Sequence, residues 1–166
     1  MIDLLTRTDP RFVEQLIRHE MDEREFKNAK IFFPYKCPAG KLTIGVGHNL
    51  EAKGIPRAMV LDLLHLDIMA AEHDLANILM VYDIHRRTLE GPRYDALVDV
   101  CFNVGARSLR GFRRMFAAIK AQDWKLASRE LLDSKYARDV KGRAITLSIQ
   151  LETGRYPNDD ESTLTA

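Results

Sequence analysis

The chain has 166 residues, of which 46% are hydrophobic and 30% are charged, a composition typical of a soluble globular protein rather than of a disordered chain. Its 25 lysines and arginines nearly balance 24 aspartates and glutamates, so the net charge is +1 and gives no general reason to expect a nucleic-acid partner. Two cysteines are too few for a disulfide framework in a chain of this size. No segment approaches the roughly 18 apolar residues of a membrane span, and the first residues do not resemble a secretion signal.

The N-terminal part predicts one helix. Thr8-Asp9-Pro10 is a favourable start, because aspartate caps a first turn and proline is tolerated in it. Apolar residues then recur with helical spacing from Val13 to Met21. Glu20 falls on this apolar stripe, so its carboxylate faces the core or the edge of a cleft, or pairs with an arginine at the helix end. Residues 22–33 extend this helix or form a loop that leads into a strand; their pattern does not decide between the two.

Residues 41–48, Lys-Leu-Thr-Ile-Gly-Val-Gly-His, alternate with the period of a strand. If they form one strand, Thr43, Gly45 and Gly47 share a nearly bare face. Glycines inside a strand are expected where a ligand or another backbone comes close. The opposite face is then apolar and is expected to meet a core through Leu42, Ile44, Val46 and His48. The alternative is a tight β-hairpin with glycines at its bends.

Helices are predicted for the rest of the chain. Ile55-Pro56 begins a long helix that ends near Val81. Asp67 lies on its apolar side and needs a polar partner, for which His48 is the natural candidate. Further helices with apolar stripes follow Gly91-Pro92. A basic cluster in this region is either a solvated face or a contact for an anionic polymer, and it consists of Arg107, Arg110, Arg113 and Arg114.

These elements predict an α+β fold with two lobes, a small N-terminal lobe containing a β-hairpin and an all-helical C-terminal lobe, joined by one long helix. We expect a single domain over residues 1–166. Within it we expect the end of the first helix and the β lobe in 12–55, the connecting helix in 56–81, the helical lobe in 82–154 and a mobile tail in 155–166.

Several separated segments carry a family resemblance. They are Leu16-Ile17-Arg18-His19-Glu20, Tyr35-Lys36-Cys37, Thr43-Ile44-Gly45-Val46-Gly47-His48 and residues 96–105, 109–112, 134–137 and 143–154. In this order they resemble the phage-type lysozymes, the T-even-like endolysins of glycoside hydrolase family 24. The resemblance covers most of residues 12–154, and the Thr-Ile-Gly-Val-Gly-His run is its most specific part. It implies a lysozyme-like fold.

The resemblance implies a catalytic triad of Glu20, Cys37 and Thr43. Glu20 would protonate the leaving glycosidic oxygen, and Thr43 would hold the attacking water. Position 37 is an aspartate in many members and a cysteine in a subset; a thiol helps only if it is partly ionised, and the alternative is that Cys37 merely packs. More residues separate Glu20 from Cys37 than is usual in the family, which leaves Glu23 and Glu25 as alternative acids.

Other functional positions are implied in the same way. Substrate binding is carried over to Asn49, Phe102, Asn103 and Arg143. Arg143 would also restrain Glu20 and tune it by its charge. An interior structural pair is carried over to His48 and Asp67. Two further sugar-contact positions of the family hold Met115 and Glu130 here. No cofactor and no metal ion are expected.

The predicted function is that of an endolysin, a muramidase that hydrolyses the β-1,4 bond between N-acetylmuramic acid and N-acetylglucosamine in bacterial peptidoglycan. The alternatives are a lytic transglycosylase acting on the same bond and a catalytically inactive lysozyme-like module that binds the wall or a protein. Peptidoglycan is the expected partner of a monomer, without nucleic acid or membrane insertion. We expect the protein in the host cytoplasm, with access to the wall through a holin or a similar pore.

Overall fold

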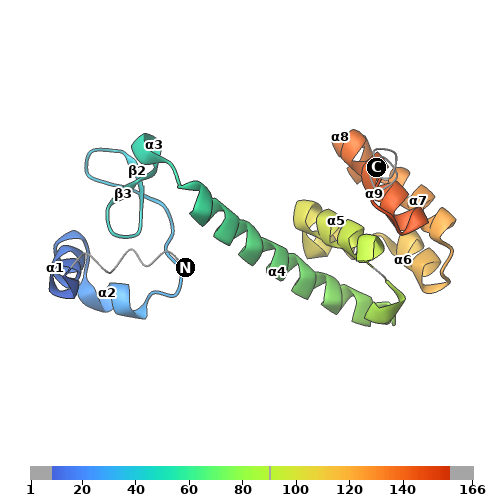
Figure 1. The fold of residues 1–166 in the computed structure, drawn as a ribbon, viewed down its shortest axis with the longest axis horizontal. Coiled ribbons are helices and arrows are strands. Elements are labelled where there is room, and N and C mark those ends of the chain that lie inside the picture. Colours follow the sequence, from blue (N-terminus) through green and yellow to red (C-terminus); the bar gives the residue numbers. More distant parts are fainter. Residues whose placement is uncertain (1–8, 90, 158–166) are drawn as a thin grey trace, which may run out of the picture. The chain divides into compact units, whose positions relative to one another are not determined.

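The computed structural model describes residues 9–89 and 91–157. It divides into two compact units, Met1–Val60 and Leu61–Ala166, which are described separately (Figure 1). Its described part combines helices with one small antiparallel sheet, so the α+β class predicted from the sequence is confirmed. Of the predicted tail, residues 158–166 lie outside the described residues, and the mobility of the tail stays a prediction.

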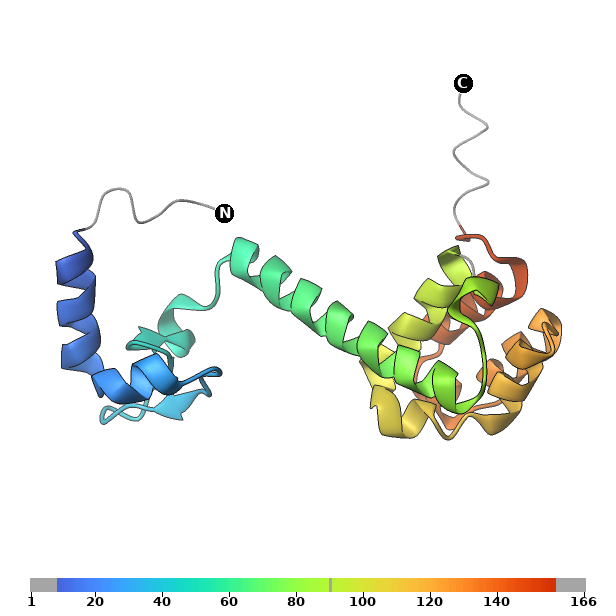
Figure 2. The same ribbon diagram turned by 90° about the horizontal axis from the view of Figure 1, so that it is seen from below.

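The N-terminal unit begins with two helices, α1 (Pro10–Glu20) and α2 (Glu23–Asn28). Asp9 caps α1, because its carboxylate accepts the Arg11 backbone N–H at 2.9 Å. Asp22 caps α2 in the same way, so the segment whose structure the pattern left open forms a separate short helix. The axis of α2 makes a steep angle with the axis of α1 (Figure 2). The two are therefore separate helices, and α1 ends at Glu20.

A three-stranded sheet follows, with strand order β1-β2-β3 and antiparallel pairing throughout. Its strands are β1 (Tyr35–Lys36), β2 (Leu42–Ile44) and β3 (His48–Asn49), and the short helix α3 (Leu50–Lys53) comes after them. In the register of the sheet, Thr43 of the central strand lies opposite Tyr35 on one side and Asn49 on the other.

Residues 41–48 form a β-hairpin, which was the alternative interpretation, and the prediction of a single continuous strand is wrong. β2 stops at Ile44, and a turn with Gly45 at φ +56° and Gly47 at φ +70° leads into β3. The predicted faces are also wrong at two positions, since Thr43 is 3% exposed and Leu42 is 38% exposed. Thr43 is covered because it is the middle residue of the central strand, whereas Leu42 lies at the end of that strand.

The helix α4 (Arg57–Val81) follows Pro56, close to the bounds predicted from the sequence. The C-terminal unit continues with the 3-10 turn η2 (Arg86–Thr88) and with α5 (Gly91–Leu109), α6 (Arg113–Lys120), α7 (Trp124–Leu132), α8 (Lys135–Val140) and α9 (Gly142–Thr153). Across residues 9–89 and 91–157, none of the helices combines the length and apolarity needed to cross a bilayer.

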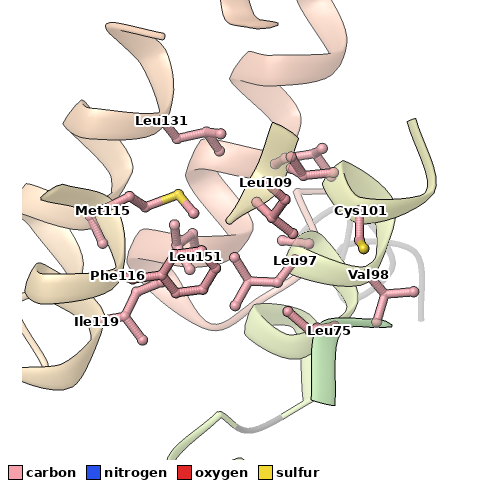
Figure 3. Packing of buried hydrophobic residues seen from close by; sticks show 14 of the residues in the cluster. Leu75, Leu97, Val98, Cys101, Leu109, Met115, Phe116, Ile119, Leu131 and Leu151 are labelled. Atoms are coloured by element: carbon pink, nitrogen blue, oxygen red, sulfur yellow. The ribbon is translucent and has the colours of Figure 1, made fainter. Parts of the chain in front are cut away.

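The hydrophobic core lies in the C-terminal unit, since the buried hydrophobic side chains of the described residues all fall between Ala71 and Leu151. Phe116 of α6 is fully buried in this core, which also contains residues from α4, α5, α7 and α9 (Figure 3). Cys101 belongs to this core, and burial raises the pKa of its thiol to about 11. Cys101 is therefore a small residue of the core.

Arg93 ties together the ends of three helices. From α5 it donates to the carbonyl oxygens of Leu151 and Glu152 at the end of α9, both at 3.0 Å. Its guanidinium also lies 4.4 Å from the centre of the Trp124 ring in α7. A Cβ at Gly154, which has φ +72°, would come within 2.6 Å of the same guanidinium, so glycine is required there.

Candidate active site

The Glu20 carboxylate lies against the turn between β2 and β3. A Cβ at Gly47 would stand 2.8 Å from Glu20 Oε2, closer than nonbonded atoms can approach. Glu20 is the last residue of α1, and its side chain is exposed. Within residues 9–60, no arginine forms an ion pair with it. The carboxylate is therefore positioned by a backbone without a side chain, and it is open to solvent.

Cys37 and Thr43 are brought together by the loop that joins β1 to β2. The Cys37 N–H donates to the Lys41 carbonyl oxygen at 3.0 Å. In return, the Lys41 N–H donates to the Cys37 sulfur, and this contact contributes most to lowering the pKa of the thiol, with a smaller contribution from the Thr43 hydroxyl. The thiol is half-buried. It is thus held where its ionised form is favoured.

The Thr43 hydroxyl lies between two acceptors. It donates to the Lys41 carbonyl oxygen at 3.0 Å and is also within hydrogen-bond reach of the Cys37 sulfur. A hydroxyl has one proton to donate and two lone pairs that accept. Its single proton can therefore serve either the carbonyl or the thiolate, while its lone pairs can accept from a water.

His48 and Asn49 have local roles in the N-terminal unit. His48 Nε2 donates to the Gly54 carbonyl oxygen at 2.7 Å. The Asn49 amide oxygen accepts the Ala52 N–H at 3.0 Å and so caps α3. Asp67 belongs to the other unit and is exposed on α4. The pairing of His48 with Asp67 stays a prediction.

Arg143 forms an ion pair in the C-terminal unit. Its Nε donates to Asp99 Oδ1 at 2.8 Å, and the Asp99 carboxylate raises the pKa of Arg143. The Tyr136 hydroxyl is buried and has no hydrogen-bond partner among the described residues. Burial and the nearby Asp99 charge raise its pKa. Asp99 is a site feature that sequence reasoning missed, because its partner Arg143 lies in another helix.

The other positions implied by the family resemblance lie elsewhere in this unit. Phe102 is 41% exposed on α5, and Asn103 beside it is exposed as well. Met115 and Glu130 line a pocket of about 760 Å³ together with Tyr136. The Glu130 carboxylate is 11% exposed and pairs with Arg114 at 2.7 Å. This pair could not be predicted from the sequence, because the two residues belong to different helices.

The structure thus combines an α+β fold with a glutamate at a helix end, which faces a glycine-rich hairpin that carries a threonine beside a thiol. Residues 32–149 match the family model of the phage lysozymes. This is more than half of the chain, and the protein belongs to the phage lysozyme family. The matched range contains Cys37 and Thr43 but begins after Glu20.

A curated relative agrees with this family. The chain is similar to the SAR-endolysin of Haemophilus phage HP1, with 28% identity over 112 residues that cover 60% of this chain and 58% of that protein. The alignment thus spans less than two thirds of the relative's length.

Proposed function

We propose that this protein is an endolysin that hydrolyses the β-1,4 bond between N-acetylmuramic acid and N-acetylglucosamine in peptidoglycan. Membership of the phage lysozyme family supports a lysozyme-type activity. The observation that carries the choice of residues is the contact of the Glu20 carboxylate with Gly47, in the unit that also holds Cys37 and Thr43.

Glu20 is the proposed general acid. Glycoside hydrolysis needs one carboxylic acid to protonate the leaving oxygen and a second group to activate water or stabilise positive charge on the sugar. Glu20 is exposed at the end of α1, so a glycosidic oxygen can reach it. Glu25, an alternative left open by the sequence, is also exposed, on α2.

Cys37 and Thr43 are the proposed second group. The lowered pKa of Cys37 favours a thiolate, whose charge can stabilise an oxocarbenium-like transition state or polarise water. Thr43 can accept from that water through its lone pairs. Because Thr43 is 3% exposed and Cys37 is half-buried, we place the water on the Cys37 side of the pair.

Substrate binding is proposed for Asn49, Phe102, Asn103 and Arg143, and a structural role for His48 and Asp67. Peptidoglycan is the proposed partner, the bacterial wall the proposed place of action, and the monomer the proposed active form. A lytic transglycosylase and an inactive binding module remain the competing functions. With purified peptidoglycan, the first predicts a different product and the second predicts none.

The decisive test compares Glu20→Gln, Glu25→Gln and Cys37→Ala with the wild type in a wall-clearing assay. Loss of a general acid is expected to lower the rate by about 100-fold or more, so Glu20→Gln should be nearly inactive and Glu25→Gln should keep full activity. New reducing ends indicate hydrolysis, and a 1,6-anhydro sugar would indicate transglycosylation. Full activity in Glu20→Gln would overturn the mechanism. Unchanged activity in Cys37→Ala would show that the thiol only packs and has no catalytic role. Wall binding without cleavage by the wild type would favour the binding module.

A further inference from the structure

A groove of about 800 Å³ lies in the C-terminal unit, and its lining contains none of the residues assigned above. It adjoins the pocket that holds Met115 and Glu130, because Arg113 lines both. One wall is the last part of α4 with the residue that follows it, including Ile78, Val81 and Tyr82. The other wall runs from the last residues of α5 to the first residue of α6, and it contributes Arg107, Arg110 and Arg113. Three of the four arginines noted in the sequence thus converge on one concave surface.

The groove is held in shape by its own walls. Gly105 has φ +74° and ψ +160°, which breaks α5 and turns its last residues. The Tyr82 hydroxyl donates to the Arg110 carbonyl oxygen at 2.7 Å. The Tyr82 ring also stacks on buried Phe116, with ring centres 4.6 Å apart. The turn that carries the arginines is therefore fixed to the end of α4 before any ligand arrives.

The three arginines have no partner of opposite charge among the described residues. Two other basic side chains of this unit are paired, Arg114 with Glu130 and Arg143 with Asp99. Arg107, Arg110 and Arg113 are exposed and form no such pair. Asp74 is the acidic residue in the lining of the groove, so the lining has two net positive charges and favours an anion.

The chemistry of the walls narrows the class of anion. Guanidinium groups bind phosphate oxygens through paired N–H donors. The facing wall combines polar Asp74 and Asn77 with apolar Ile78 and Val81. Val81 is 56% exposed, and Met80 beside it in the sequence, outside the groove lining, is 71% exposed. Cationic side chains beside exposed apolar ones suit a surface where phosphate groups and hydrocarbon lie close together. A soluble phosphate polymer offers the charge without the apolar part.

We propose that this arginine groove is a binding site for phosphate groups of anionic phospholipids, through which the protein attaches to the surface of a membrane without inserting into it. The phosphate diester is the recognised group, and the apolar edge of α4 contacts the lipid around it. This proposal does not depend on the proposed glycosidase activity, because it uses none of the residues assigned to that reaction.

The test is co-sedimentation of the full chain with phosphatidylcholine vesicles, with and without phosphatidylglycerol, at low salt. The groove variant is Arg107→Gln/Arg110→Gln/Arg113→Gln. The matched control, Lys125→Gln/Arg129→Gln/Arg155→Gln, loses the same charge from exposed positions of the same unit. Each basic residue near an anionic lipid surface contributes about a five-fold factor in binding. The groove variant should therefore bind phosphatidylglycerol vesicles about 100-fold more weakly, and the control should bind within a few-fold of the wild type.

Circular dichroism of both variants checks that they fold, and Glu20→Gln should bind vesicles like the wild type whatever its activity. Equal losses in the groove and control variants would overturn the site, because net charge alone would then explain binding. Groove-dependent binding to soluble polyphosphate without binding to vesicles would overturn the assignment to lipid. Absence of vesicle binding by the wild type would overturn the proposal as a whole.

Discussion

At the end of α1, the Glu20 carboxylate occupies space that a side chain at position 47 would need. The turn therefore needs glycine at this position for two reasons: its φ of +70° and its closeness to the carboxylate. Gly45 shares only the first reason, since its φ is +56° and nothing lies within 4 Å of where its Cβ would be. This difference makes the contact testable.

We predict that Gly47→Ala lowers wall-clearing activity far more than Gly45→Ala does. Both variants should lose about 1–2 kcal/mol of unfolding free energy, because alanine is strained at positive φ. Gly47→Ala should also displace the Glu20 carboxylate, and a displacement of about 1 Å can cost about 100-fold in rate. Rates and thermal unfolding of both variants check this, and equal rate losses would show that the strained turn alone matters.

Cys37 provides a second prediction, based on pH. A lowered pKa means that the thiolate appears at lower pH than in a free thiol, whose pKa is about 8.5. The rate of alkylation by iodoacetamide should therefore rise with a midpoint below that value. Thr43→Val removes one donor to the sulfur and should move the midpoint upward, part of the way, because the Lys41 N–H remains.

Cys101 is the internal control for this measurement. It is 2% exposed and its pKa is about 11, so it should stay unmodified in the folded protein, as mass spectrometry of the peptides can show. Alkylation of Cys37 with the midpoint of a free thiol would contradict the role assigned to the hydrogen bonds of its loop.

At the scale of elements, the hairpin shows where sequence reasoning stops. The alternation of apolar residues with glycine fits one continuous strand, and it fits two strands joined by a turn equally well. The two cannot be told apart from the sequence, because glycine is compatible with a strand and with the positive φ that Gly45 and Gly47 adopt in the turn. The start of α4 was predictable because Pro56 fits the first turn of a helix.

The Arg114–Glu130 and Arg143–Asp99 ion pairs could not be predicted from the sequence, because each joins residues from different helices. Glu20, Cys37 and Thr43 were found through a resemblance, and their roles remain predictions.

A further prediction concerns the effect of Gly105, in α5, on stability. Its φ and ψ of +74° and +160° lie in a region that residues with a Cβ rarely adopt, at a cost of about 1–3 kcal/mol. Gly105→Ala should therefore lower the free energy of unfolding by that amount in urea. Gly142→Ala is the matched control, because Gly142 lies in α9 without close neighbours and alanine should gain about 0.5 kcal/mol there. Equal effects of the two substitutions would contradict the need for glycine at the break.

At the scale of the whole molecule, the buried side chains are distributed unevenly. The hydrophobic core lies between Ala71 and Leu151, whereas Thr43 is the buried residue of the described N-terminal unit. Local opening costs least where few apolar side chains are buried. Stability should therefore differ between the two units.

We predict that hydrogen exchange separates them. Amides in α5, α7 and α9 should exchange only through global unfolding, while those in α1 and α2 should exchange through local opening at a rate faster by orders of magnitude. Exchange followed by mass spectrometry on peptides from both units measures this. Uniform protection along the chain would show that the two units unfold together.

Arg93 has a consequence for how the helical unit can be observed. Its guanidinium covers the face of Trp124 while donating to the last carbonyls of α9, and Trp124 is the single tryptophan of the chain. When α5 separates from α9, the cation leaves the indole and the emission of the ring changes. The protein therefore has a built-in fluorophore that reports the closure of its helical unit, and no added label is needed to follow that step in time.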